Sequence, residues 1–253
     1  MTISVNADAN VGPRQRPPLR SWSMRVVDSF DVASNMRRII LTTRDIAEFA
    51  YKPGQALVLM VPLPNGEMGR RDYTIRTFDR SAGTIGIDFV LHGDTPAPTW
   101  ARSARPGDMI EARGPRGGTV LRPNADWHLL TGDETCIPAI AHILETMPDG
   151  SKAFVFIEVS GKDAKVPLKT RANAVIRWMH RNDLPPGPSN LMNGAVQDFA
   201  LPPGRGHAYI IGETSNVRRQ RHMLIARGLT LNQISSEGYW RPGRIGGHDH
   251  VDD

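Results

Sequence analysis

The chain has 253 residues, of which 40% are hydrophobic, and a formal net charge of +5 at pH 7. This length allows one large domain or two of ordinary size, and the hydrophobic content is sufficient for packed cores. The single cysteine, Cys136, excludes an intramolecular disulfide and offers no cysteine pair for a zinc or iron–sulfur site. The positive charge favours acidic partners such as nucleotides, phosphates or anionic chelates.

Residues 1–19 are expected to form a disordered arm, because proline and glycine interrupt the segment and no hydrophobic period begins before Trp22. The segment is polar and lacks the apolar core of a signal peptide. The sequence also has no run of about 18 apolar residues, the length that a membrane span requires. A cytoplasmic location without a membrane partner is therefore the default expectation.

Residues 20–123 contain short strand-like runs separated by residues typical of turns, such as Pro53-Gly54 and Pro106-Gly107. Runs at this spacing predict a small antiparallel β-barrel. One helix is expected after Pro96. The expected strands are residues 24–30, 36–43, 55–63, 72–78, 84–92 and 109–113, and the expected helix is 97–104.

Residues 124–245 show a different pattern, in which strands alternate with helices. This alternation predicts a parallel sheet with right-handed crossovers. The expected strands are 128–131, 153–159, 174–180, 207–211 and 232–239. The expected helices are 137–147 and 215–227, the second with Ser215 as its N-cap, and residues 182–203 are expected to form a loop with a short helix. The fold class is thus an antiparallel β-barrel followed by an α/β domain, with a boundary near 121–126 and a polar tail at 246–253.

Residues 70–76 concentrate three arginines, a tyrosine and a threonine in one predicted strand. An arginine fork suits a diphosphate. The ring of Tyr73 suits a flat heteroaromatic group, and the hydroxyl of Thr74 can bond a ring nitrogen. Together these side chains fit a flavin dinucleotide. An ordinary amphipathic strand with a solvated basic face is the alternative.

The pattern Arg71-x-Tyr73-Thr74-x-Arg76 resembles the flavin fingerprint of the siderophore-interacting proteins, which are flavin reductases in the ferredoxin–NADP reductase superfamily. Further segments match this family in the same order over roughly residues 20 to 245, and the ordered set is more specific than any single motif. These segments are 88–94, 100–101, 106–108, 114–117, 132–135, 138–140, 212–213 and 238–241.

The resemblance implies that Arg71 pairs with the diphosphate of FAD, that Tyr73 packs on the isoalloxazine ring and that Thr74 bonds the ring near its redox-active nitrogen. A helix beginning near Ala97 is expected to attract phosphate through its amide groups. The family usually has glycine and serine where this chain has Thr95 and Pro98. The other residues expected to contact FAD are Arg76, Asp88, Phe89, Val90, His92, Ala97, Thr99 and Trp100, with a packing role as the alternative for His92.

The α/β domain is expected to bind NADPH or NADH as electron donor. By the resemblance, the turn Gly132-Asp133-Glu134-Thr135 lies near the nicotinamide, and Gly212-Glu213 ends another parallel strand, where ligands bind at the switch point of a sheet. The G-x-G-x-x-G fingerprint is absent, and plain strand-to-helix turns are the alternative. Ser160 and Lys162 follow another strand end and favour NADPH.

The C-terminal strand is expected to return to the flavin, with Trp240 as a flat wall and Arg241 and Arg244 as a cationic mouth for an anionic ferric siderophore. A frayed tail is the alternative. The resemblance implies an FAD enzyme that transfers electrons from NAD(P)H to ferric siderophores and releases Fe(II), with no catalytic side chain. A monomer is expected. Cys136 is then expected to be structural.

Two other functions fit parts of the sequence. One is a flavoprotein reductase of the same fold that uses ferredoxin as donor or reduces another acceptor. The other is a non-enzymatic basic protein that binds nucleotides or RNA. A nucleic-acid partner is not expected, because the sequence lacks the interleaved aromatic and basic residues that stacking sites need.

Overall fold

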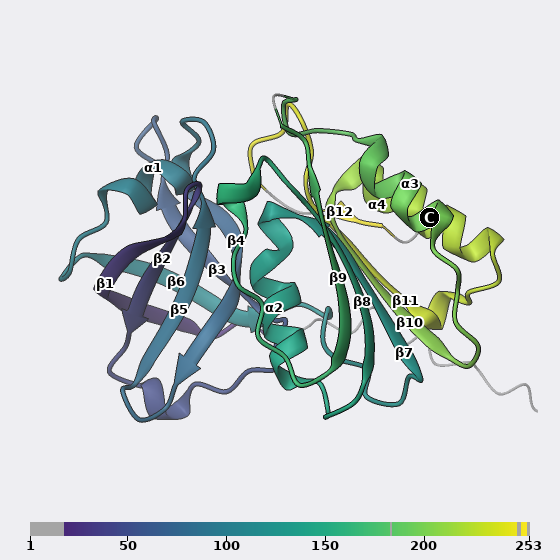
Figure 1. The fold of residues 1–253 in the computed structure, drawn as a ribbon. Coiled ribbons are helices and arrows are strands. Elements are labelled where there is room, and N and C mark those ends of the chain that lie inside the picture. The colour runs from purple at the N-terminus through teal and green to yellow at the C-terminus, as the bar shows by residue number, and fades with distance from the viewer. Residues whose placement is uncertain (1–17, 183, 247–248, 252–253) are drawn as a thin grey trace, which may run out of the picture.

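The computed structural model describes residues 18–182, 184–246 and 249–251, which form two domains packed side by side (Figure 1). Almost all of the arm expected at 1–19 lies outside the described residues. None of the helices in the described part of the chain is long and apolar enough to cross a bilayer.

The first domain is a closed barrel in the order β1-β2-β5-β4-β3-β6, with every neighbouring pair antiparallel. This confirms the predicted barrel. Trp22, Met24 and Val26 are buried at alternate positions of β1, as a strand with one face on the core requires. The elements are β1 (Ser21–Ala33), β2 (Met36–Thr42), η1 (Ile46–Glu48), β3 (Ala56–Pro62), β4 (Met68–Asp79), β5 (Thr84–Val90), α1 (Pro96–Ser103) and β6 (Met109–Arg116).

The second domain is a sheet in the order β12-β11-β10-β7-β8-β9, parallel except for β12. The parallel sheet was also predicted. Helix α2 covers one face, and α3 and α4 cover the other (Figure 1). Every residue of β7 and β10 is buried, because both faces are covered. The elements are β7 (Trp127–Asp133), η2 (Glu134–Cys136), α2 (Ile137–Thr146), β8 (Lys152–Val159), η3 (Lys162–Ala164), β9 (Asn173–His180), α3 (Asn190–Asp198), β10 (Gly206–Glu213), α4 (Thr214–Ala226), η4 (Leu231–Gln233), β11 (Ile234–Trp240) and β12 (Asp249–His250).

The structure corrects two expectations near the C-terminus. The described part of the segment expected as a polar tail includes β12, which pairs antiparallel with β11, and Val251 is 2% exposed. A polar strand can do this because the pairing uses main-chain hydrogen bonds. The N-cap of α4 is Glu213 rather than Ser215, since the Glu213 carboxylate accepts from the amides of Ser215 and Asn216 at 3.0 and 2.9 Å.

Candidate active site

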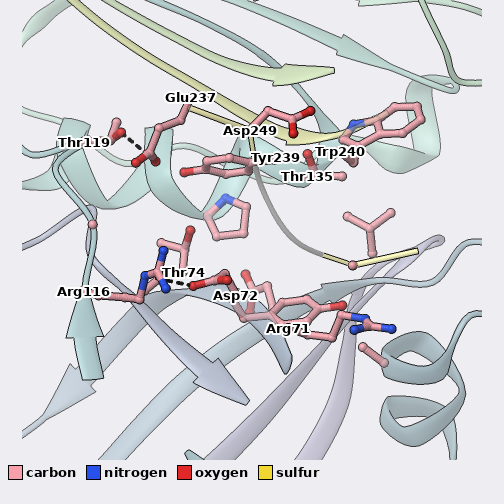
Figure 2. A pocket seen from close by; sticks show the side chains of 18 of the residues that line it. Arg71, Asp72, Thr74, Arg116, Thr119, Thr135, Glu237, Tyr239, Trp240 and Asp249 are labelled. Carbon is pink, nitrogen blue, oxygen red and sulfur yellow. Dashed lines mark hydrogen bonds and ion pairs between the residues drawn. The ribbon is translucent and has the colours of Figure 1, made fainter. Parts of the chain in front are cut away.

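A cavity of about 820 Å³ lies between the two domains. Its size is within the range of small-molecule sites, and a domain interface is a common place for one. Figure 2 shows Arg71 and Thr74 of the barrel on one side of this cavity, facing Tyr239 and Trp240 of the sheet domain on the other. The predicted flavin motif and the predicted acceptor motif therefore meet in one site.

Strand β4 changes partners in the middle of the flavin motif. It pairs with β3 as far as Thr74, and it pairs with β5 from Ile75 onward. Beyond Ile87, β5 continues beside β2, and Asp88 and Val90 line the cavity. The two strands thus separate at the cavity, so that side chains from both faces of β4 reach it.

Arg71, Tyr73 and Thr74 all line the cavity. The Tyr73 ring packs on the Phe89 ring with centroids 4.2 Å apart, and burial raises the pKa of the Tyr73 hydroxyl. Arg71 donates through Nη1 to the carbonyl of Arg70 at 2.8 Å. A side chain at Gly246 would collide with the Arg71 guanidinium, so the chain after β11 passes directly over it.

Four residues expected to contact FAD lie outside the cavity lining. Arg76 instead pairs with Glu145 of α2, because β4 now faces the second domain. Phe89 is fully buried in the barrel core, where the Trp100 ring packs on it with centroids 5.5 Å apart. Thr99 is exposed, and its amide bonds the Thr95 carbonyl at 3.0 Å within α1. These positions can support the cavity wall but do not form it.

Asp88, Val90, His92 and Ala97 do line the cavity. The Asp88 carboxylate accepts from Nε and Nη2 of Arg38 at 2.6 and 2.8 Å, so its charge is already paired. His92 is exposed at the cavity, yet the protein around it excludes enough water to lower its pKa, and the charge of Asp133 opposes this shift.

The first turn of α1 offers fewer amide donors than an ordinary helix. Pro96 and Pro98 have no N–H, and the amide of Thr99 is used within the helix. Among residues 96–99 this leaves the amide of Ala97 to face a ligand. A phosphate contact from Thr99 would therefore use its exposed hydroxyl rather than its amide.

The strand ends of the sheet domain are held together by their own side chains. The Asp133 carboxylate accepts from the Thr135 amide and hydroxyl at 2.9 and 2.5 Å. It also accepts from the Glu213 amide at 3.0 Å and from Nε1 of Trp240 at 2.9 Å. Burial raises the pKa of Asp133, and the hydrogen bonds from Thr135 and Trp240 counteract this shift. Gly212 is required here, because its φ is +130° and a Cβ would lie 2.8 Å from Asp133 Oδ2.

Glu134 also binds groups of the sheet domain itself. Its carboxylate receives two hydrogen bonds of 2.8 Å from Arg181 and one of 2.7 Å from the Ser160 amide. Glu158 lies beside the same guanidinium at 3.5 Å. Of the six residues expected to bind the nicotinamide nucleotide, Thr135 lines the large cavity. Gly132, Asp133 and Glu213 line a second, small pocket at the strand ends, and Glu134 and Gly212 line neither of the two.

Trp240, Arg241 and Arg244 line the cavity from the second domain. The indole of Trp240 is oriented by its bond to Asp133. Both arginines lie beside Asp249 of β12, Arg244 in direct contact and Arg241 with an N–O distance of 3.9 Å. Sequence reasoning assigned Asp249 to the tail and missed it.

Several further lining residues were also missed. Arg116 and Asp72 form an ion pair at 3.3 Å within the barrel. Thr119 donates to Glu237 across the domains at 3.1 Å, over a separation of 118 residues (Figure 2). The hydroxyl of Tyr239 bonds Thr74, and burial raises its pKa well above the usual value. Tyr239 belongs to a motif that the sequence analysis recognised, whereas the pairs Arg116–Asp72 and Thr119–Glu237 join residues far apart in the chain and left no local signal.

Comparison with known proteins identifies the family. The siderophore-interacting protein model matches residues 125–243, and the siderophore-interacting FAD-binding domain model matches 63–119. Ferric vibriobactin reductase ViuB of Vibrio cholerae is 31% identical over 240 residues, covering 84% of this chain and 86% of ViuB. The chain belongs to the siderophore-interacting protein family.

Two further proteins are also similar to this siderophore-interacting protein. The crystal structure of a siderophore utilization protein from T. fusca is 33% identical, with a TM-score of 0.83, and the match covers 91% of this chain and 96% of that one. The uncharacterized protein Rv2895c of Mycobacterium tuberculosis is 38% identical over 185 residues, or 69% of this chain. That match spans 65% of the length of Rv2895c.

The cavity of this siderophore-interacting protein fits FAD. The separation of β4 from β5 makes room for a ring system beside Tyr73 and Thr74. Arg71 and the Ala97 amide supply donors for a diphosphate on the same cavity wall. Tyr239, on the opposite wall, adds a second aromatic surface.

Proposed function

We propose that this protein is an FAD-containing reductase that transfers electrons from NAD(P)H to ferric siderophores and releases the iron as Fe(II). One observation carries the proposal: the flavin motif of β4 and the basic residues after β11 line the same cavity. The similarity to ferric vibriobactin reductase supports the same reaction class.

Bound FAD would supply the exchange between two-electron and one-electron chemistry that links a nicotinamide to ferric iron. In this proposal the protein supplies placement. Arg71 pairs with the diphosphate, Tyr73 packs on the ring system, and the hydroxyl of Thr74 bonds the ring. Because one hydride carries two electrons, each NAD(P)H would reduce two ferric ions.

The acceptor would bind at the mouth of the cavity. Arg241 and Arg244 are 49% and 38% exposed, so an anionic chelate can reach them. Their positive field would raise the local concentration of such a chelate and its association rate. Trp240, oriented by Asp133, would provide a flat wall beside it.

The donor would approach the carboxyl ends of β7, β8 and β10, where ligands bind in open parallel sheets. Ser160 and Lys162 after β8 favour NADPH, and NADH is the alternative. Asp133, Glu134 and Glu213 are internally bonded, so their proposed contribution is to shape the turn. We further propose that the protein acts as a monomer in the cytoplasm.

Rapid-mixing spectroscopy tests the proposal. The FAD-loaded protein is mixed anaerobically with NADH, NADPH or reduced ferredoxin, and bleaching of the flavin absorbance is followed. Ferric chelates are then added, with a ferrous-specific chelator to trap the product. We expect bleaching by a nicotinamide nucleotide and reoxidation by ferric siderophores. Failure to bind FAD, or a reduced flavin that ferric chelates do not reoxidise, would overturn the proposal.

A further inference from the structure

Asp249 lies where the proposed acceptor would bind. Its Oδ1 contacts Nη1 of Arg244, and its Oδ2 lies 3.9 Å from Nη1 of Arg241. All three side chains line the cavity. The arginines that would attract an anionic chelate are thus already associated with an anion that belongs to the protein.

Asp249 is held more firmly than its partners. It pairs with Gly238 in the β11–β12 ladder, and its Oδ2 lies 2.9 Å from the Thr214 hydroxyl. Its side chain is 16% exposed, against 49% for Arg241 and 38% for Arg244. The carboxylate therefore has a fixed place, while the guanidinium groups can turn toward solvent.

Asp249 is charged at neutral pH. Desolvation acts to raise its pKa, but the Thr214 hydroxyl and the two arginines outweigh that effect, and the pKa is lowered. The two arginine side chains are the exposed partners, so an incoming anion can reach them and take the place of the carboxylate. After displacement the fixed carboxylate stays close to the bound anion and repels it.

We propose that Asp249 is a specificity-determining residue, an internal anion that competes with the ferric chelate for Arg241 and Arg244. The inference rests on the proposed function. A chelate oxygen takes the place of the carboxylate on the arginines, and the remaining negative charge disfavours chelates with a high negative charge. The carboxylate therefore reduces the advantage that the two arginines give to a trianionic ferric chelate over a neutral or weakly anionic one.

The test is the variant Asp249→Asn, which removes the charge and keeps the size and an acceptor for Thr214. Binding of a trianionic tris-catecholate chelate and of a neutral tris-hydroxamate chelate is titrated against the oxidised, FAD-loaded protein at low ionic strength, with flavin fluorescence as the readout. We expect about threefold to tenfold tighter binding of the trianionic chelate. Binding of the neutral chelate should change by less than about twofold.

Asp149→Asn is the matched control, because Asp149 pairs with Arg171 at 2.9 Å on an exposed surface outside the cavity lining. It should change neither affinity. The gain from Asp249→Asn should also be much smaller when Arg241 and Arg244 are both replaced by Ala, because the chelate then no longer binds beside the carboxylate. A gain of the same size in that background would show that Asp249 acts without competing for the arginines and would overturn the competition.

The variant Thr214→Val tests the position of the carboxylate separately from its charge. It removes the hydroxyl that bonds Asp249 Oδ2 but leaves the negative charge in place. If Asp249 mainly holds β12 in place, Asp249→Asn and Thr214→Val will each change the affinities for the trianionic and the neutral chelate by the same factor, and the proposal fails. If the wild-type protein binds no ferric chelate, the proposed function fails and the inference fails with it. If the wild type binds them and Asp249→Asn does not alter the charge preference, the inference alone is wrong.

Discussion

Arg76 of β4 and Glu145 of α2 form a bidentate ion pair across the two domains, with N–O distances of 2.9 and 2.7 Å. Beside it, Nδ1 of His142 lies 2.6 Å from the carbonyl of Ile75, and its Nε2 lies 3.1 Å from the Tyr51 hydroxyl. The carbonyl can only accept, so Nδ1 carries the proton and Nε2 accepts from Tyr51.

This contact joins the two walls of the cavity. Strand β4 presents Thr74 on one side, and Pro138 at the start of α2 lies on the other. Because Arg76 and Glu145 are close to these residues in sequence, their ion pair limits how far the walls can separate.

Replacing Glu145 by Ala should therefore weaken both the fold and FAD binding. The Arg76 side chain is 7% exposed and would lose its partner, which should lower the free energy of unfolding by at least about 1–3 kcal/mol. Urea denaturation and an FAD titration measure the two effects. Glu48→Ala is the control, since its pair with Arg20 at 2.6 Å is exposed and should contribute less than about 1 kcal/mol. Equal losses in the two variants would contradict the role given to Glu145.

Acid should destabilise the protein partly through His207. Burial, aided by Arg122 and His128, lowers the pKa of His207 to about 4. Between about pH 6.5 and 4 the unfolded chain binds a proton at this residue that the folded protein does not, so the free energy of unfolding falls as the pH is lowered. The stabilisation that depends on neutral His207 should be fully present above pH 6.5.

The variant His207→Gln removes this titration and should flatten the pH dependence of the urea midpoint between pH 6.5 and 4. It keeps a polar group near Ser235, whose hydroxyl lies 2.9 Å from Nε2 of His207. His222→Gln on the exposed side of α4 is the comparison variant for a histidine-to-glutamine change. A slope that is the same in wild type and His207→Gln would refute the assignment.

Arg71→Ala should lower FAD affinity on the order of tenfold to a hundredfold, because it removes a charge-assisted contact worth roughly 1.5–3 kcal/mol. A flavin titration followed by fluorescence measures this. Arg70→Ala is a close control, since Arg70 is exposed and its side chain is not part of the cavity lining. If both variants bind FAD as tightly as wild type, Arg71 is only a surface charge.

Cys136→Ala should retain most of the reductase activity. The thiol is fully buried, and burial together with the charge of Asp133 raises its pKa well above the usual value, so it stays protonated. Its role is in packing. Cys136 lies directly against the backbone of Gly132, where an added Cβ would come within 2.5 Å of the Cys136 Cβ. Turnover and flavin content are measured together. Loss of turnover in a variant that keeps its FAD would reveal a chemical role for the thiol.

Replacing both Arg241 and Arg244 by Ala should raise the KM for an anionic ferric chelate at low ionic strength. The difference from wild type should shrink at high salt, where screening already weakens the attraction. Flavin reduction by NAD(P)H should change little. If flavin reduction is the step that slows, these arginines serve the donor rather than the acceptor.

The local pattern of the sequence determined the elements and the two-domain order. Alternating burial along strands such as β1, and turn residues such as Pro53-Gly54, are properties of neighbouring residues, so they can be read from a single chain. The motif at Arg71, Tyr73 and Thr74 was local in the same sense, and the structure places all three on the cavity.

The tertiary structure decided what each polar side chain binds. Arg76 shares the flavin motif with Thr74, yet it faces Glu145, because β4 changes partners between them. Asp133 was expected near the nicotinamide, but it holds Trp240, a residue 107 positions away. Such pairings depend on long-range packing that brings distant segments together, and neither periodicity nor composition encodes them. For the same reason the sequence predicted Asp249 as part of a polar tail, whereas in the structure the pairing of β12 with β11 places it beside Arg241.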